Sequence, residues 1–194
     1  MGLSRRGFIQ TAGAAAGALA IGKSARAETA PTHDTDGQHS VLVDTVVCIG
    51  CRKCEWACNN QHKLSTRSLA SYEDKSVFGK LRRPDHDAYT VVNEFANPAV
   101  GAKKFTVKVQ CMHCLQPACA SACIVGALTK DPSGPVVYDA WKCIGCRYCM
   151  VACPFQIPAY EYHDAASPEV KKCTFCLERL KTGEKPACVG ICPN

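Results

Sequence analysis

Apolar residues in this chain come in short runs rather than in long helical stripes. Residues 89–95 and 105–109 are rich in β-branched and aromatic side chains, and the second run alternates apolar with polar positions. We expect these two runs to pair as a hairpin. Shorter apolar runs at 41–43 and 136–138 are expected to form strands as well. The pattern predicts small strand pairs and no long helix.

A second hairpin is predicted where residues 127–129 and 136–137 flank a turn. The turn sequence, residues 131–134, reads Asp-Pro-Ser-Gly, and each of these residue types favours a tight turn. Strand pairs joined by loops and short helices indicate an α+β fold.

The N-terminal 27 residues have the order of features expected of an export signal. Arg5 and Arg6 precede a weakly apolar run at 11–22, which is too short for a confident membrane span, and an Ala-Arg-Ala cleavage signature ends at Ala27. We interpret residues 1–27 as a twin-arginine signal peptide, which directs a folded protein to the periplasm. Residues 28–40 are interpreted as a linker to the domain at 41–194.

Cysteine changes this picture most, because the chain has 16 of them among 194 residues. They fall into four groups of four: Cys48, Cys51, Cys54 and Cys58; Cys111, Cys114, Cys119 and Cys123; Cys143, Cys146, Cys149 and Cys153; Cys173, Cys176, Cys188 and Cys192. Residues 59–110 are an insertion between the first two groups. Short helices are expected to follow the third or fourth cysteine of each group.

The first and third groups share the C-x2-C-x2-C-x3-C spacing of bacterial ferredoxins, which bind 4Fe-4S cubanes. Residues 41–58 and 136–153 align with ten identities in eighteen positions, which indicates an internal duplication. Gly50 and Gly145 occupy equivalent places, where a missing Cβ lets the ligand loop turn tightly. We therefore predict duplicated ferredoxin-like modules, organised around four cubane clusters.

The second and fourth groups have wider middle gaps, so their spacing is less specific. Two cysteine pairs separated by eleven residues, as in the last group, also suit a zinc site. The alternatives to four cubanes are therefore a mixture with one zinc site or a smaller cluster, a structural zinc protein and an exported disulfide protein.

The charge balance argues against nucleic acid as a partner. The formal net charge is +6, but four of the positive charges lie in the predicted signal peptide. Four oxidised cubanes with their thiolates, at roughly −2 each, would make the exported protein acidic.

Three segments extend the motif set beyond the cysteine spacing: Gln-Cys-Met-His-Cys at 110–114, Cys-Arg-Tyr-Cys-Met-Val-Ala-Cys-Pro-Phe at 146–155, and Lys-Cys-Thr-Phe-Cys at 172–176. With them, the chain resembles the four-cluster iron-sulfur subunits of the dimethyl sulfoxide reductase and polysulfide reductase type. It is similar also to the ferredoxin-like subunit of uptake hydrogenase and that of the high-molecular-weight cytochrome c complex. The resemblance covers residues 41–194, and it implies further sequence beyond Asn194.

In that family the first group pairs with the fourth and the second with the third, each giving its last cysteine to the partner's cluster. The resemblance therefore implies four ligand sets: Cys48, Cys51, Cys54 and Cys192; Cys173, Cys176, Cys188 and Cys58; Cys111, Cys114, Cys119 and Cys153; Cys143, Cys146, Cys149 and Cys123.

The resemblance also implies a non-catalytic subunit that relays electrons in anaerobic respiration. One partner would be a catalytic redox subunit, such as a hydrogenase, a molybdopterin enzyme or a multihaem cytochrome c. The other would be a quinone-interacting integral membrane subunit, which would hold the complex at the membrane. The alternative is a free-standing periplasmic polyferredoxin that diffuses between partners.

Several side chains near the cysteines permit two interpretations. Arg52 and Arg147, at equivalent loop positions, would either raise a cluster potential or be ordinary solvated residues. Trp141 suggests packing or an interface anchor. A basic stretch at 80–83 suggests a solvated loop or a docking surface. His113 is not expected to be a ligand, because four cysteines already serve its group.

Overall fold

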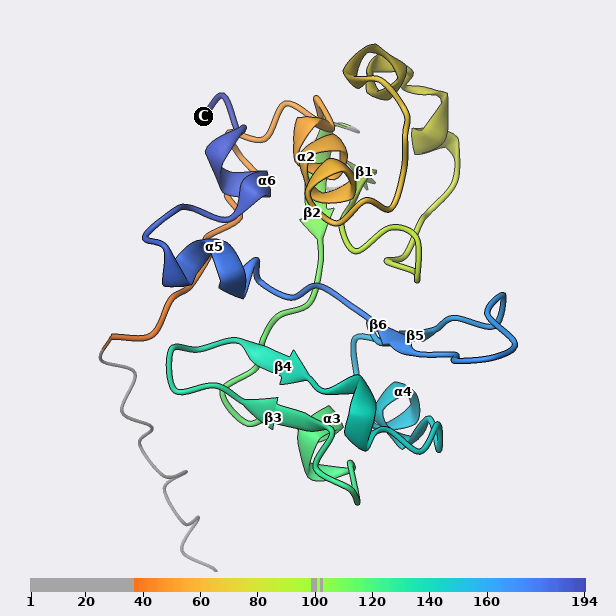
Figure 1. Ribbon diagram of the computed structural model, residues 1–194. Coiled ribbons are helices and arrows are strands. Elements are labelled where there is room, and N and C mark those ends of the chain that lie inside the picture. The colour runs from red at the N-terminus through yellow and green to blue at the C-terminus, as the bar shows by residue number, and fades with distance from the viewer. Residues whose placement is uncertain (1–36, 99–100, 102) are drawn as a thin grey trace, which may run out of the picture. The chain divides into compact units, whose positions relative to one another are not determined.

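A computed structural model describes residues 37–98, 101 and 103–194 (Figure 1). All sixteen cysteines lie in this part of the chain. The predicted signal peptide and most of the predicted linker lie outside the described residues.

The strands form three antiparallel pairs. They are β1 (Val91–Asn97) with β2 (Lys103–Val109), β3 (Leu128–Lys130) with β4 (Val136–Tyr138), and β5 (Ala159–Tyr160) with β6 (Val170–Lys171). Both predicted hairpins are confirmed, with Val91 opposite Val109 in the first and Leu128 opposite Tyr138 in the second. The β5–β6 pair was not predicted, because two-residue strands carry no readable alternation.

The strand predicted at 41–43 is wrong. These residues form an extended loop, and Leu42 is 91% exposed. No strand pairs with this segment among the described residues, so its backbone lacks the ladder that defines a strand. Nearby, the His39 amide donates to the Ser133 carbonyl at 2.9 Å, which fastens the segment to the β3–β4 turn.

The helices are short, as expected. They are α2 (Lys53–Gln61), α3 (Ala118–Ser121), α4 (Tyr148–Ala152), α5 (Leu177–Lys181) and α6 (Ala187–Gly190), with 3-10 turns η1 (Leu69–Glu73), η2 (Ser76–Gly79) and η4 (Ala140–Lys142). Their predicted position needs correction, because α2, α3, α4 and α6 contain the third cysteine of their group instead of following it. In α2 and α4, a left-handed residue directly before the helix (Arg52 and Arg147) turns the chain early enough for this.

The helices that carry cysteines pack in two pairs. Helix α2 packs against α6, and α3 packs against α4 (Figure 1). The first pair joins the first and fourth cysteine groups, and the second pair joins the second and third. Helix packing thus brings together cysteines that are distant in the sequence.

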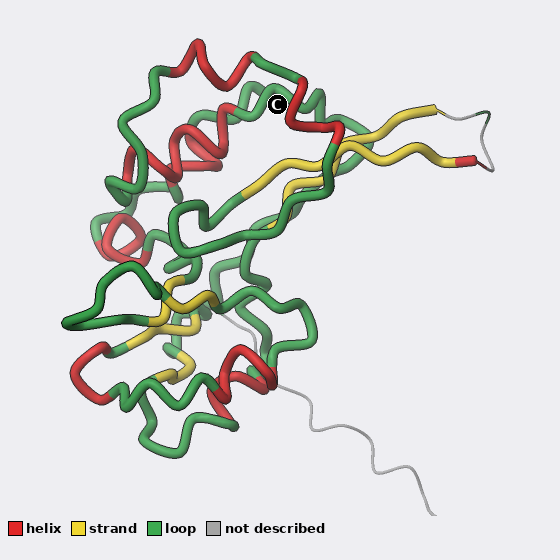
Figure 2. The backbone as a smooth tube through the Cα atoms, turned by 90° about the vertical axis from the view of Figure 1, so that its right-hand side faces the viewer, coloured by secondary structure: helices red, strands yellow, loops and turns green. Residues whose placement is uncertain are grey.

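Loops make up much of the remaining chain, as the tube in Figure 2 shows. The insertion at 59–110 contributes η1, η2, β1 and β2, and η1 packs on α2. Within the part of the chain that the structure describes, no helix is long and apolar enough to cross a membrane.

Candidate metal centres

In the first C-x-x-C loop of each group, the third of the four positions is left-handed. These residues are Gly50 (φ 65°), His113 (φ 44°), Gly145 (φ 69°) and Phe175 (φ 58°), and in the last group the next residue, Cys176 (φ 50°), is left-handed as well. The left-handed conformation costs glycine little and other residues more, so the non-glycine residues are held in place by their surroundings.

This backbone conformation aims amides at sulfur. The Gly145 amide donates to Cys143 Sγ at 3.4 Å, and the Phe175 amide donates to Cys173 Sγ at 3.3 Å. In the second group, the His113 amide is hydrogen-bonded to the Cys111 thiol. Amides directed at sulfur favour the thiolate that iron requires.

The two loop glycines also permit close packing, which the sequence did not indicate. A Cβ on Gly50 would lie 2.7 Å from Thr106 Cγ2, and one on Gly145 would lie 2.6 Å from the Tyr160 hydroxyl oxygen. Thr106 and Tyr160 come from β2 and β5, so these loops are pressed against segments distant in sequence.

The structure brings the cysteines together across the groups. Cys48, Cys51, Cys54, Cys188 and Cys192 line a cavity of about 570 Å³. Cys58, Cys173, Cys176 and Cys188 line a second cavity, and Cys123, Cys143, Cys146 and Cys149 line a third. In the remaining set, Cys111 lies within electrostatic reach of Cys114 and Cys153, and Cys119 within reach of Cys111 and Cys153. Each predicted ligand set is therefore gathered in one place, and that each holds a cluster stays a prediction.

Several of the thiols are buried enough to resist ionisation without a metal. Burial raises the pKa of Cys54 and of Cys173 to about 12, and that of Cys149 to about 11. Neighbouring thiols add to this effect, as the charge of Cys188 does at Cys54. A bound cation removes this cost, because it replaces the proton on sulfur.

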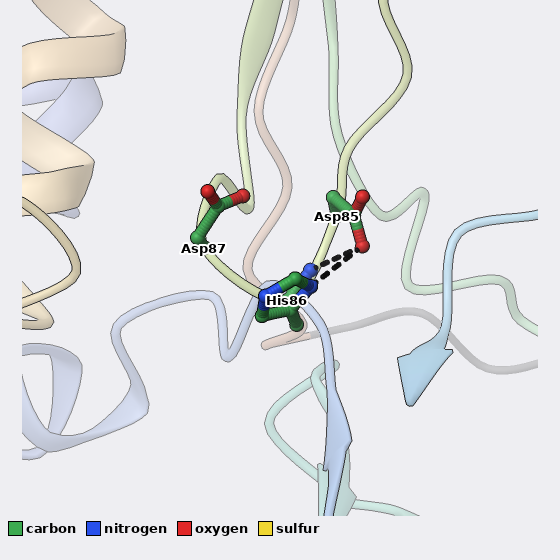
Figure 3. A group of neighbouring side chains, drawn as sticks. All are labelled: Asp85, His86 and Asp87. Carbon is green, nitrogen blue, oxygen red and sulfur yellow. Dashed lines mark hydrogen bonds and ion pairs between the residues drawn. The ribbon is translucent and has the colours of Figure 1, made fainter. Parts of the chain in front are cut away.

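The thiols do not lie as close together as the ligands of a zinc ion. Tetrahedral zinc, with Zn–S bonds of about 2.3 Å, holds its sulfur ligands roughly 3.8 Å apart. The described residues, which include every cysteine, contain one group of three His, Cys, Asp or Glu side chains whose ligand atoms lie within 4.8 Å of one another. This group is Asp85, His86 and Asp87 and contains no cysteine (Figure 3). A cubane keeps its four sulfur ligands further apart, because each thiolate binds a different iron.

The Asp85 group is an exposed turn of the insertion. Asp85 accepts hydrogen bonds from the amide and the ring of His86, at 2.7 and 3.0 Å. These bonds account for the arrangement without a metal ion.

Two residues near the thiols were given no role from the sequence. Lys108 Nζ lies 3.4 Å from Cys188 Sγ, and its charge also acts on Cys54. His62 Nε2 lies 3.7 Å from Cys176 Sγ. Lys108 stands in the alternating strand β2, and its placement beside sulfur depends on how that strand packs, so no sequence signal could have found it.

His113 is buried and is held in a single orientation. Its Nδ1 accepts from the Val136 amide at 2.9 Å, so that atom is unprotonated, while Nε2 is buried with no polar partner. Burial, with the charges of Lys172 and Lys130, lowers the pKa of His113 to about 3. The ring contacts Phe175 edge-on, with 5.0 Å between centroids.

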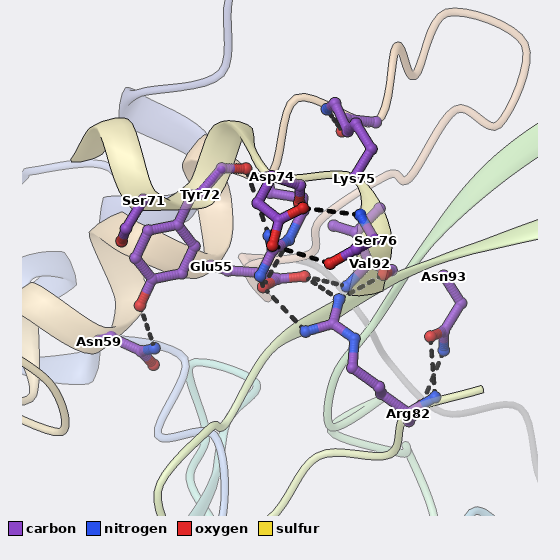
Figure 4. Close-up of polar contacts among 12 residues, drawn as sticks. Glu55, Asn59, Ser71, Tyr72, Asp74, Lys75, Ser76, Arg82, Val92 and Asn93 are labelled. Carbon is purple, nitrogen blue, oxygen red and sulfur yellow. Dashed lines mark hydrogen bonds and ion pairs between the residues drawn. The ribbon is translucent and has the colours of Figure 1, made fainter. Parts of the chain in front are cut away.

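Arg52 is not a solvated residue, nor is it a free cation beside a cluster. It is 4% exposed and pairs with Glu55, with Nη2 2.9 Å from Oε2. Glu55 also pairs with Arg82 at 2.6 Å and accepts from the Val92 amide at 2.6 Å (Figure 4). Arg82 of the basic stretch therefore holds the insertion in contact with α2 through this ion pair and does not belong to a solvated loop.

Arg147, at the equivalent place in the duplication, is exposed. Its guanidinium lies over Tyr160 and Tyr162, 5.6 and 6.0 Å from the ring centroids. The position equivalent to Glu55 is Met150, so no acid is present there to pair with it. The two duplicated segments, residues 41–58 and 136–153, therefore differ in the charge that lies beside equivalent loops.

The third group is surrounded by exposed apolar side chains. Trp141 is 99% exposed and Val151 is 86% exposed, with Ile144 and Tyr148 also exposed. Trp141 does not pack against the residues that the structure describes, which favours the interface interpretation. Large exposed apolar residues of this kind often mark interaction sites.

Comparison with known proteins places these features in a family. Residues 102–194 match the family model of the 4Fe-4S dicluster domain. A protein of Nitratidesulfovibrio vulgaris strain Hildenborough is 47% identical over 195 residues, which cover 99% of this chain and 52% of that protein. Hydrogenase-2 operon protein HybA of Escherichia coli O157:H7 is 35% identical over 98% of this chain and 60% of its own length. The chain thus spans between half and two thirds of these two relatives.

A shorter relative is covered more fully. The B subunit of the anaerobic dimethyl sulfoxide reductase of Haemophilus influenzae is 35% identical over 160 residues, which cover 80% of this chain and 70% of that subunit. The chain therefore belongs to the family of 4Fe-4S iron-sulfur subunits that includes the B subunit of dimethyl sulfoxide reductase.

Proposed function

We propose that this protein is the electron-transfer subunit of an exported, membrane-associated respiratory oxidoreductase. In this proposal it holds four 4Fe-4S clusters and relays electrons between a catalytic or cytochrome subunit and a quinone-linked membrane subunit. The clusters would supply the redox chemistry, while the chain holds them at fixed distances and adjusts their potentials.

The gathering of thiols from different cysteine groups into shared cavities is the observation that supports this proposal. Each predicted ligand set combines cysteines from two groups, and the packing of α2 on α6 and of α3 on α4 produces the combination. The names of the relatives, which are subunits or operon proteins of dimethyl sulfoxide reductase and hydrogenase systems, support a role inside an oxidoreductase complex.

Export by the twin-arginine route is part of the same proposal and rests on residues 1–27. Replacing Arg5 and Arg6 with lysine should leave the protein in the cytoplasm with its clusters assembled. Equal amounts of the variant and the parent protein in the periplasm would contradict this route.

The rival function is a free polyferredoxin, and the exposed apolar residues near the third group favour a fixed complex instead. Gentle membrane extraction should recover the protein with partner subunits, and Trp141→Ala with Val151→Ala should weaken that association. Leu81→Ala is the matched control, because Leu81 is also exposed but lies in the insertion. A monomer that leaves the membrane fraction in every variant would support the polyferredoxin.

The direct test is the content of iron and acid-labile sulfide in protein purified without oxygen, with EPR of the dithionite-reduced sample. Four cubanes predict about sixteen of each per chain and coupled cubane signals. Zinc without sulfide would overturn the proposal.

A further inference from the structure

Cysteines of three groups meet at a place that no helix pair accounts for. Cys173 of the fourth group and Cys58 of the first lie in one buried cluster, and Cys111 of the second group packs against it. The His113 ring contacts Phe175 at the same place, so the loop of the second group touches the loop of the fourth. This contact joins the two halves of the cysteine array, and we refer to it as the inter-pair junction.

Lys172 lies at the inter-pair junction and is 5% exposed. Its ammonium donates to the Cys173 carbonyl at 3.1 Å and to the Val136 carbonyl of β4. No carboxylate lies within 4 Å of it among the described residues. A buried ammonium without a counter-charge is costly, so the surroundings must supply negative charge in another form.

Sulfur is the available source of that negative charge. The Lys172 ammonium is hydrogen-bonded to the carbonyl of Cys173, and Cys111 of the second group packs against the cluster that contains Cys173. The Lys172 charge acts on Cys111, Cys119 and Cys173. Two of these thiols belong to the second group and one to the fourth. Lys172 therefore acts on ligands from both halves of the cysteine array, whereas Lys108 acts on thiols of the first and fourth groups, which form one half.

We propose that Lys172 is a positioning residue whose buried charge raises the reduction potentials of the two clusters at the inter-pair junction. These clusters are the one on Cys111, Cys114, Cys119 and Cys153, and the one on Cys173, Cys176, Cys188 and Cys58. The inference rests on the proposed function. A reduced cluster carries one more negative charge than an oxidised one, so a fixed cation beside it favours reduction. Burial protects this effect from screening by salt.

The neighbouring residue provides a matched control. Lys171 has the same chemistry, but it is paired with Glu169 at 2.7 Å and Glu161 at 3.3 Å, and about a quarter of its side chain is exposed. Its charge is therefore already balanced by carboxylates. Lys171→Met should leave all cluster potentials close to those of the parent protein.

The experiment is an EPR-monitored redox titration of full-length protein prepared without oxygen, with iron and sulfide measured in every variant. Lys172→Met and Lys172→Gln remove the charge, and the glutamine keeps an N–H donor for the two carbonyls. Each variant should decrease the equilibrium constant for one-electron reduction of these two clusters by about tenfold. This change corresponds to potentials that are lower by about 59 mV. Lys172→Arg should restore the parent values.

Three results would overturn the inference. Shifts equal to those of Lys171→Met would show that the charge does not act on the clusters. Equal shifts of all four clusters would show that it is not specific to the inter-pair junction. Loss of iron in both neutral variants, with Lys172→Arg fully loaded, would make Lys172 a structural cation. A parent protein without four clusters would instead refute the proposed function.

Discussion

The two equivalent loop arginines provide a matched test of how the insertion stabilises the first module. Arg52 and Arg147 have nearly the same backbone conformation, with φ of 63° and 62°. Replacing either one with alanine therefore carries the same left-handed penalty. Any difference between the two variants reports what the arginine side chains contact.

Arg52→Ala removes a buried, two-pronged ion pair with Glu55 and two hydrogen bonds to the carbonyls of Tyr72 and Asp74. Breaking a buried pair costs about 3 to 5 kcal/mol, and the lower end applies because Glu55 keeps Arg82 as a partner. With a guanidinium m-value of about 5 kcal/mol/M for a domain of this size, the unfolding midpoint should fall by roughly 0.6 M. Arg147→Ala should leave the midpoint nearly unchanged, because that side chain is exposed.

Anaerobic guanidinium titrations followed by cluster absorbance and circular dichroism would measure both midpoints. Equal midpoints for the two variants would refute the argument, because the buried network would then contribute no more than an exposed side chain. A larger loss for Arg147→Ala would refute it as well.

Three further predictions follow from single features of the site. Gly50→Ala should lower the cluster content, because the new Cβ would lie 2.7 Å from Thr106 Cγ2. Gly126→Ala is the control, because Gly126 also has a positive φ but has open space around it, and its iron content should not fall. Equal iron content in the two variants would contradict this. Cys192→Ala should abolish the EPR signal of the cluster on Cys48, Cys51 and Cys54 and leave the two clusters of the second and third groups intact. Loss of a signal from those two clusters would disprove the pairing. Burial raises the pKa of Cys173 from 9.0 to about 12, so this thiol should not affect the stability of metal-free protein below pH 9 and should lower it by on the order of 1 kcal/mol by pH 10. A denaturant midpoint that does not fall with pH would oppose this.

The sequence alone determined those features that depend on residues close together in the chain. The two main hairpins follow from turn residues and alternation, and the cubane chemistry follows from cysteine spacing within each loop. The run at 41–43 was mispredicted as a strand because β-propensity does not reveal whether a partner strand is present.

What only the tertiary structure decided is the environment of each loop. Cys58 and Cys173 are far apart in the chain, and spacing alone cannot show that they share a cavity. Arg52 and Arg147 are identical in the duplication, yet one is buried by Glu55 and the insertion while the other remains exposed. The burial of Lys172 and its missing counter-charge also had no signal in the sequence, because both arise from packing between segments and not from the residues beside it.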